Sequence, residues 1–255
     1  MPLSDTQIDR YSRQILLREI GGVGQEKLLA AKVFLLGAGG LGSPVALYLA
    51  AAGVGTLVIA DHDRVDLSNL QRQIIHTRQS VGTPKVHSAT RAIAALNSDV
   101  TVIPREGRVN AENVREWIAE CDLVVDGSDN FATRHLINEA CLQEKKTLIS
   151  GAVLGFEGQV ATFRHGIDAK APCYACLFPT PPAPGTAPTC STAGVLGALP
   201  GLVGTIQATE TIKEILGIGQ SLAGFMLLIN ALDGIYHRIQ IPKNPDCPLC
   251  GGKKG

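Results

Sequence analysis

The sequence has no net charge, no long hydrophobic run and no internal repeat. Its 255 residues hold 23 basic and 23 acidic side chains, so no overall field draws the chain to nucleic acid or to a membrane surface. The most apolar window, about residues 193–206, contains Pro200 and several glycines and is shorter than the roughly 20 residues that span a bilayer. We expect a buried helix there. The lack of a repeat excludes a solenoid.

The N-terminus also lacks a secretion signal. Residues Met1–Asp5 contain no basic segment followed by an apolar core, which argues against export. The seven cysteines do not fit the disulfide framework of a small secreted domain, and their pairing in the sequence indicates metal binding in a reducing compartment. We therefore expect a cytoplasmic protein with neither a membrane nor a nucleic acid as its partner.

Four of the cysteines form two CxxC pairs, Cys173 with Cys176 and Cys247 with Cys250. Each pair supplies two thiolates from one tight turn, and four thiolates satisfy tetrahedral zinc. About seventy residues separate the pairs, so the zinc would be structural and would tie the middle of the chain to its C-terminus. The alternative is a set of inert buried thiols, but the proline and glycine beside the second pair favour a zinc knuckle.

Short apolar runs alternate with helix-like segments through the first part of the chain. The runs at 32–36, 56–61, 100–103, 123–126 and 146–150 are predicted strands, with helices at about 43–52, 84–96 and 112–119 and after Asn130. This alternation predicts a doubly wound, mostly parallel, Rossmann-like sheet over residues 31–151. Residues 1–30 are predicted to be helical, with Tyr11, Ile15 and Leu16 on one face.

The alternation of predicted strands and helices does not continue through residues 152–255. The runs at 159–163 and 226–229 are predicted strands without a simple helix between them, so we expect C-terminal antiparallel strands that extend the same sheet. The proline-rich segment at about 178–190 suits an exposed, mobile crossover. The prediction is therefore one α/β domain, residues 1–255, with a parallel half over residues 31–151 and a second half over residues 152–255 that holds the zinc knuckle.

A glycine-rich turn follows the first predicted strand, with Gly37, Gly39, Gly40 and Gly42 in it. Such a turn lets the backbone approach phosphate and aims helix amides at it. The motif alone is weak, since it could be only a tight turn or an NAD site. Asp61, about 20 residues on, would grip a ribose, but NAD and ATP both carry a ribose.

Two cations and a carboxylate discriminate between these alternatives. Arg72 and Lys85 follow the second predicted strand, and Asp129 follows the apolar run at 121–127. A dehydrogenase needs no such group, whereas a triphosphate substituted at its α-phosphorus needs its charge neutralised as pyrophosphate leaves. A strand-end aspartate can also hold magnesium. Singly, the cations could be solvated surface charges, and Asp129 or Asn130 could cap the next helix.

These motifs together resemble the MoeB/ThiF/HesA family, enzymes that adenylylate ubiquitin-like proteins, with matches from Arg13 to Cys250. The resemblance implies that Asp61 binds the ribose of ATP and that Asn69, Arg72 and Lys85 bind its phosphates. It assigns Asp129 to Mg²⁺ and to catalysis, and it supports zinc at the cysteines. The remaining nucleotide-site residues of these motifs are Gly37, Gly39, Gly40, Gly42, Ser68, Leu70, Gln71 and Asn130.

Three further residues are candidates for particular roles. By the same resemblance Arg13 reaches the ATP of a neighbouring subunit, so a homodimer would be part of the active site. Cys190 is expected at the start of an apolar helix, where a thiol's pKa falls. The resemblance to ThiF-like members implies that it could bond covalently to the activated partner or to sulfur, whereas the resemblance to MoeB-like members implies an unreactive residue. Arg134 is expected to be structural and to pair with acids near the sheet edge. Cys121 and Cys141 are expected in the core.

The activity implied by the resemblance is ATP-dependent adenylylation of the C-terminal carboxylate of a small ubiquitin-like sulfur carrier ending in Gly-Gly. Because the chain ends soon after Cys250, no rhodanese-like domain is expected, and sulfur would come from a separate donor. The alternatives are adenylylation of a peptide or of a modified tRNA base, an NAD-dependent oxidoreductase, and an inactive scaffold. Molybdopterin, thiamine and tRNA-thiolation pathways all use this chemistry, so the pathway stays open.

Overall fold

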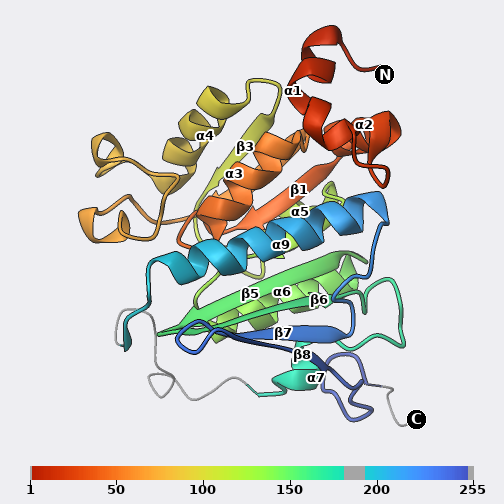
Figure 1. Ribbon diagram of the computed structural model, residues 1–255. Helices are drawn as coiled ribbons and strands as arrows, with labels where there is room; N and C mark the ends of the chain where they lie inside the picture. The colour runs from red at the N-terminus through yellow and green to blue at the C-terminus, as the bar shows by residue number, and fades with distance from the viewer. Residues whose placement is uncertain (1, 181–192, 252–255) are drawn as a thin grey trace.

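An eight-stranded sheet runs through the whole molecule (Figure 1), in the order β3-β2-β1-β4-β5-β6-β7-β8. The computed structural model describes residues 2–180 and 193–251. Strands β1 to β5 are parallel, and β6, β7 and β8 are antiparallel. The predicted doubly wound, mostly parallel sheet with antiparallel C-terminal strands is thus confirmed. The strands are β1 (Lys32–Leu36), β2 (Thr56–Asp61), β3 (Thr101–Glu106), β4 (Leu123–Asp126), β5 (Thr147–Leu154), β6 (Glu157–Phe163), β7 (Phe225–Asn230) and β8 (Ile235–Gln240).

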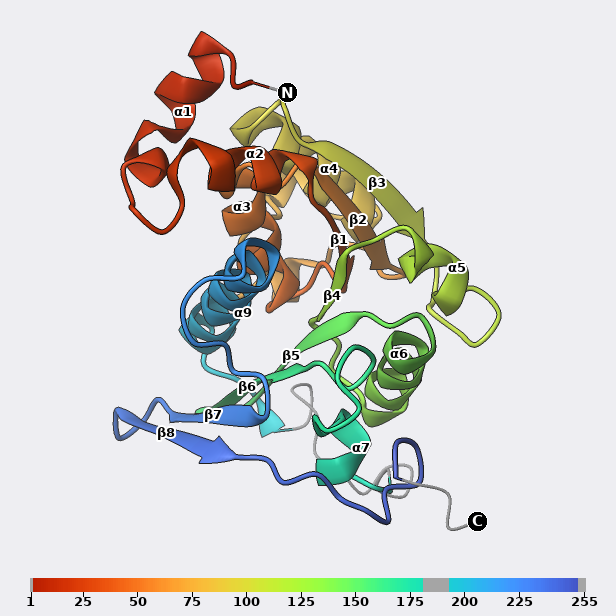
Figure 2. The same ribbon diagram turned by 90° about the vertical axis from the view of Figure 1, so that its right-hand side faces the viewer.

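Helices cover both faces of the sheet. Figure 2 shows α9 and α3 on one side of the strands and α5 and α6 on the other. The α-helices are α1 (Asp5–Ile15), α2 (Gly21–Ala30), α3 (Gly42–Ala52), α4 (Lys85–Leu96), α5 (Val114–Ala119), α6 (Phe131–Gln143), α7 (Tyr174–Leu177) and α9 (Ala198–Leu216). Two short 3₁₀ turns, Leu67–Asn69 and Arg78–Ser80, lie in the connection after β2.

The alternation of side chains along β1 explains the two layers. Val33 and Leu35 are fully buried on the face that α3 and α9 cover, and Phe34 and Leu36 lie in the separate apolar cluster beneath α5 and α6. Successive residues of a strand point to opposite faces, so a strand buried on both faces reads as the continuous apolar run seen in the sequence. The central strands are therefore held from both sides.

The N-terminal segment departs from its predicted face. Ser4 caps α1 through a capping box with Gln7, and Tyr11 is buried, with its hydroxyl accepting a hydrogen bond from Asn97 at 2.8 Å. Leu16, however, is 75% exposed. Leu16 is the helical C-cap of α1, and its position five residues after Tyr11 places it well round the helix from the buried tyrosine, so the prediction that it shares the buried face is wrong.

The C-terminal part adds elements that the apolar pattern did not predict. Strand β8 pairs with β7 along its length although all of its residues are exposed, so no hydrophobic alternation marks it. The long apolar helix is α9, which begins at Ala198; the proline-rich segment lies outside the described residues from residue 181 to residue 192. In the described ranges no helix combines the length and apolar character needed to cross a bilayer.

Candidate nucleotide site and cysteine cluster

The glycine-rich loop connects β1 to α3 at the point where the strand order reverses, since β2 and β4 flank β1. This switch point is where doubly wound sheets bind ligands. Gly37 has φ of 94°, and a Cβ on Gly42 would lie 1.8 Å from the Gly37 carbonyl oxygen. A Cβ on Gly37 would lie 3.1 Å from the carbonyl oxygen of Gly127, after β4. Only glycines let these two loops and the helix approach so closely.

Asp61, the last residue of β2, holds this loop in place. One carboxylate oxygen accepts a hydrogen bond from the Ala38 amide at 2.8 Å, and the other accepts one from the Asp63 amide at 2.8 Å. His76 supports the same loop from behind: Nε2 lies 2.8 Å from the Ala38 carbonyl oxygen, and Nδ1 lies 2.9 Å from the Ser88 hydroxyl. Burial lowers the pKa of His76, so the neutral ring acts as a fixed spacer.

A cavity of about 620 Å³ opens over the ends of β1, β2 and β4 and continues along β5 and β6. This volume is typical of small-molecule sites. The predicted residues that line it are Gly37, Gly39, Gly40, Asp61, Arg72, Lys85, Asp129 and Asn130. The far side of the cavity is formed by residues 152–154 of β5 and 157–159 of β6. The cavity thus has space for two groups side by side.

Other predicted residues support the loops without lining the cavity. Gly42 makes the close helix approach, and Asn69 closes the first 3₁₀ turn by accepting a hydrogen bond from the Asp66 amide at 3.3 Å. The amide of Ser68 donates to Asp66 at 2.8 Å. Leu70 and Gln71 are likewise not among the lining residues. The side chain of Asn69 completes this turn, and its phosphate role stays a prediction.

The two predicted phosphate cations lie in different environments. Arg72 lines the cavity and donates to the Ser68 carbonyl at 3.2 Å. Lys85 is buried, and its Nζ lies 2.8 Å from Asp63 Oδ2. Asp63 also lines the cavity and belongs to a carboxylate–imidazole group with Asp61 and His62. The alternative that Lys85 is a solvated surface charge is wrong, because its side chain is buried against a counter-ion.

The loop after β4 separates the two candidate capping residues. Asn130 is the N-cap of α6, with its side-chain oxygen accepting a hydrogen bond from the Thr133 amide at 2.9 Å. Asp129 does not cap the helix; it is exposed and lines the cavity. Its carboxylate is thus available to a ligand, as the magnesium prediction requires.

Burial raises the pKa of the Asp126 carboxyl and the nearby Arg134 charge lowers it, but within the described part of the chain Arg134 forms no direct ion pair with an acid. The guanidinium is buried and donates to the Ser128 carbonyl at 2.8 Å, and among the described residues no carboxylate oxygen lies within the 4.0 Å of an ion pair. Backbone carbonyls at the strand ends take the place of the expected acids.

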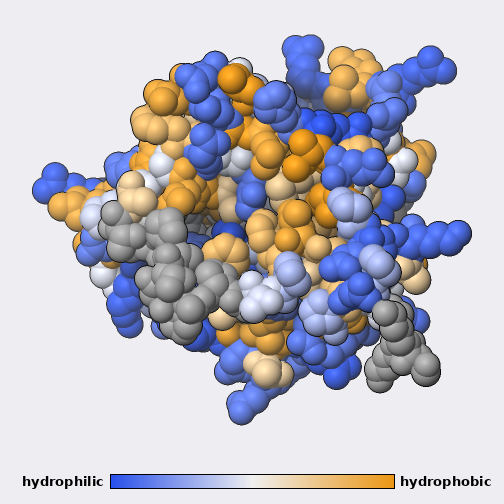
Figure 3. All heavy atoms as spheres, turned by 90° about the horizontal axis from the view of Figure 1, so that it is seen from below, coloured by the Kyte–Doolittle hydropathy of each residue, from blue (hydrophilic) through white to orange (hydrophobic). Residues whose placement is uncertain are grey.

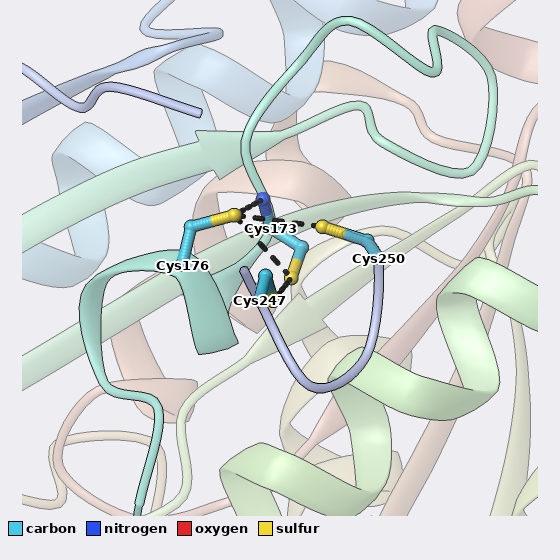
Figure 4. Close-up of side chains that lie close together, drawn as sticks. All are labelled: Cys173, Cys176, Cys247 and Cys250. Atoms are coloured by element: carbon cyan, nitrogen blue, oxygen red, sulfur yellow. Dashed lines mark hydrogen bonds between the residues drawn. The ribbon is translucent and has the colours of Figure 1, made fainter. Parts of the chain in front are cut away.

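The four predicted zinc ligands converge (Figure 4), although they come from α7 and from the C-terminal loop. Sulfur–sulfur separations are 3.7 Å for Cys173 and Cys247 and 3.5 Å for Cys176 and Cys250. Tetrahedral thiolates about 2.3 Å from zinc lie roughly 3.8 Å apart, so the cluster fits zinc. Burial opposes ionisation, but amide donors from Cys250 and Leu249 lower the pKa of Cys247 to about 7. Cys121 and Cys141 are buried in the core, as predicted.

Two predicted residues are not brought to the cavity. Cys190 lies outside the described residues. Arg13 is exposed in the last turn of α1 and does not line the cavity, and within the described ranges its side chain makes no hydrogen bond or ion pair. A role for Arg13 in its own chain's site is not supported by this geometry.

The cavity also contains residues that the sequence motifs did not identify. These include Asp63, Arg108, Glu157 and Gln159. Asp63 follows Asp61 by two positions, a spacing that keeps both carboxylates near one strand end and could have revealed it. Arg108 follows β3, and Glu157 and Gln159 lie on β6; the pairing of these strands is set by topology, so no local motif marks the three residues.

The strand order and the cavity at the switch point define a doubly wound α/β protein with a ligand site at the strand ends. The ThiF family matches residues 11–249, and the chain belongs to this family. It is 51% identical over 251 residues to the SAMP-activating enzyme E1 of Haloferax volcanii, covering 98% of this chain and 92% of that protein. It is 47% identical over 247 residues to the sulfur carrier protein adenylyltransferase of Thermus thermophilus, covering 96% and 91%. The chain is an adenylyltransferase.

Two further comparisons agree with the fold. The chain is 43% identical to the adenylyltransferase and sulfurtransferase MOCS3 of Sus scrofa, covering 98% of this chain but about half, 54%, of that protein. A crystal structure of E. coli MccB with MccA-N7isoASN superposes with a TM-score of 0.85 at 22% identity, covering 97% of this chain and 76% of that one. That likeness shows the shared fold.

Proposed function

We propose that the chain adenylylates the C-terminal glycine carboxylate of a ubiquitin-like sulfur carrier, using ATP. The observation that carries the proposal is the continuous cavity at the strand ends, lined by Arg72, Lys85 and Asp129 on one side and by β5 and β6 on the other. ATP would occupy the side at the glycine loop, and the end of the carrier's chain would enter along the strands. The names of the most similar relatives, which refer to SAMP activation and sulfur carriers, support this substrate class.

In the proposed reaction a carboxylate oxygen of the carrier attacks the α-phosphorus of ATP. The bond from that phosphorus to the bridging oxygen of the β-phosphate breaks, giving an acyl-adenylate and pyrophosphate. Arg72 and Lys85 would stabilise the charge that develops on the leaving group, and Asp61 would orient the ribose. Asp129 would hold Mg²⁺, which supplies further charge neutralisation when bound.

The cysteine cluster would hold a structural zinc, because all four ligand positions come from the protein and none is left for water. Arg13 would complete the site of a second subunit in a homodimer. A separate donor would supply sulfur to displace AMP, and Cys190 is the candidate for a covalent contact in that later step. Cys190→Ala should leave the adenylylation step itself unchanged.

Adenylylation of a peptide is the second candidate. Solved structures of MccB with its peptide MccA share this fold, but at identities of 22–23% they support only the architecture. The much higher identity to the carrier-directed relatives favours the carrier.

Pyrophosphate exchange tests the proposal. With a ubiquitin-like carrier ending in Gly-Gly, the wild type should exchange labelled pyrophosphate into ATP, and Asp129→Ala should lower the exchange by about 10³-fold. The matched control is Asp168→Ala, an exposed aspartate outside the cavity, which should retain full exchange. Exchange that persists in Asp129→Ala, or that occurs with a free peptide and not with the carrier, would contradict the proposal.

A further inference from the structure

The backbone of Ser128, the residue before Asp129, is held from both sides by buried ionisable side chains. Its amide donates a hydrogen bond to Asp126 Oδ1 at 2.9 Å, and its carbonyl oxygen accepts one from an Arg134 terminal nitrogen at 2.8 Å. Asp126 ends β4 and Arg134 lies in the first turn of α6. The strand before the loop and the helix after it therefore hold the same residue.

Asp126 is itself fixed by its neighbours. It is completely buried, and its second carboxylate oxygen accepts a hydrogen bond from the Ser150 hydroxyl at 3.3 Å. Its carbonyl oxygen accepts a hydrogen bond from Gln207 Nε2 at 2.8 Å. Ser150 on β5 thus holds the carboxylate and Gln207 on α9 holds the backbone of Asp126, so the orientation of the carboxylate toward the Ser128 amide is built into the core.

Arg134 connects the loop to the other half of the cavity. The nitrogen that donates to Ser128 also lies 3.5 Å from the Gly151 carbonyl oxygen on β5, and the residues after Gly151 line the far side of the cavity. Arg134 is 7% exposed, its Nε lacks a hydrogen-bond partner among the described residues, and it lines the cavity. A buried guanidinium is costly unless it is paired. Burial raises the pKa of the Asp126 carboxyl and the nearby Arg134 charge lowers it, so the two buried groups favour each other's ionised form while Arg134 donates to the Ser128 and Gly151 carbonyls.

We propose that Asp126 and Arg134 are positioning residues that set the place of the Asp129 carboxylate in the cavity. Asp126 fixes the Ser128–Asp129 loop where it leaves β4. Arg134 fixes the loop where it enters α6 and also fixes its distance from β5. The inference rests on the proposed function, because it assumes that Asp129 acts in adenylylation. A displacement of about 1 Å at such a site lowers the rate by roughly 10²-fold.

The test is a double-mutant cycle between Arg134→Gln and Asp129→Asn, measured by pyrophosphate exchange with a ubiquitin-like carrier ending in Gly-Gly. Arg134→Gln should lower kcat by about 10²-fold in the wild-type background and by less than about twofold in the Asp129→Asn background, because it acts through Asp129. The Mg²⁺ concentration for half-maximal exchange should rise, while KM for the carrier stays unchanged. Arg134→Lys keeps the charge and can donate to one carbonyl, so it should recover part of the loss.

The control is Arg164→Gln, which removes an arginine paired with Glu214 at 2.8 Å and outside the nucleotide cavity. Its effect should be the same in both backgrounds. Thermal melting checks that each variant folds, and if Arg134→Gln does not fold, the cycle is run with Arg134→Lys. Equal losses in both backgrounds, or an unchanged Mg²⁺ requirement, would overturn the inference. An Asp129→Asn enzyme with full exchange would instead overturn the proposed function.

Discussion

Lys85 Nζ lies 2.8 Å from Asp63 Oδ2 at the wall of the nucleotide cavity. The lysine side chain is 7% exposed and the aspartate side chain 52%, so the buried cation has its counter-ion at the cavity surface. Burial opposes ionisation of Asp63, but the hydrogen bond and charge of Lys85 lower its pKa below 3.8. A phosphate entering the cavity would share Lys85 with this carboxylate, and we therefore expect Asp63 to moderate the affinity for ATP.

The first prediction concerns Asp63→Asn. The variant should melt at a lower temperature without ligand, because the buried lysine loses its counter-ion, yet gain more stability from MgATP than the wild type does. Thermal shifts with and without MgATP measure both effects. Glu144→Gln, which breaks the surface pair with Arg115, should leave the response to MgATP unchanged. Equal responses in the wild type and Asp63→Asn would contradict a moderating role.

The same pair predicts a pH dependence. A carboxyl group with a lowered folded-state pKa stabilises the protein above its unfolded pKa, and the contribution is lost as the pH falls through the folded value. Below about pH 3.8 the wild type should therefore lose stability more steeply than Asp63→Asn. Parallel curves would show that the pair contributes nothing to folding.

The second prediction concerns the glycine loop. Gly42→Ala should destabilise the fold by about 3 kcal/mol or more, because the new Cβ would lie 1.8 Å from the Gly37 carbonyl oxygen and neither backbone can move freely. Gly22→Ala is the control: no atom lies within 4 Å of its added Cβ, and the helix should gain about 0.5–1 kcal/mol. Denaturant unfolding compares the two, and a stable Gly42→Ala would mean that the loop is not so closely packed.

The third prediction concerns metal. Purified reduced protein should contain one zinc per chain, and Cys250→Ser should lose both zinc and stability, because a structural site couples binding to folding. Cys121→Ala, a buried cysteine outside the cluster, should lose some stability but keep its zinc. Metal analysis with thermal melting distinguishes these outcomes. Zinc-free wild type that is fully folded would refute the assignment.

The fourth prediction concerns assembly. Homodimers of Arg13→Ala and of Asp129→Ala should each be inactive, and mixed dimers should recover about half of wild-type activity, since one of two symmetric sites keeps both residues. The reason is that Arg13 is exposed on α1, away from its own cavity. Subunit exchange followed by the exchange assay measures recovery. No recovery after demonstrated exchange would place Arg13 outside the site.

Much of the surface around these sites is mixed in character. Figure 3 shows apolar areas among polar ones on the side where β7, β8 and α7 lie, and the exposed apolar residues of this region include Leu232, Ile235 and Tyr236. The apolar pattern does not predict β8, because a strand that is exposed on both faces has no alternation of buried and exposed residues. Pairing with β7 forms it.

The sequence by itself determined the parallel half of the sheet, the glycine turn and the cysteine pairs. Buried strands such as β1 read as apolar runs, positive φ at Gly37 needs glycine, and CxxC spacing is local, so each signal lies within a few residues. Only the tertiary structure decided which charges meet. Asp63 pairs with Lys85, and Arg134 donates to the Ser128 carbonyl. Strand order and helix packing set these distances, and no short segment of the sequence specifies either of them.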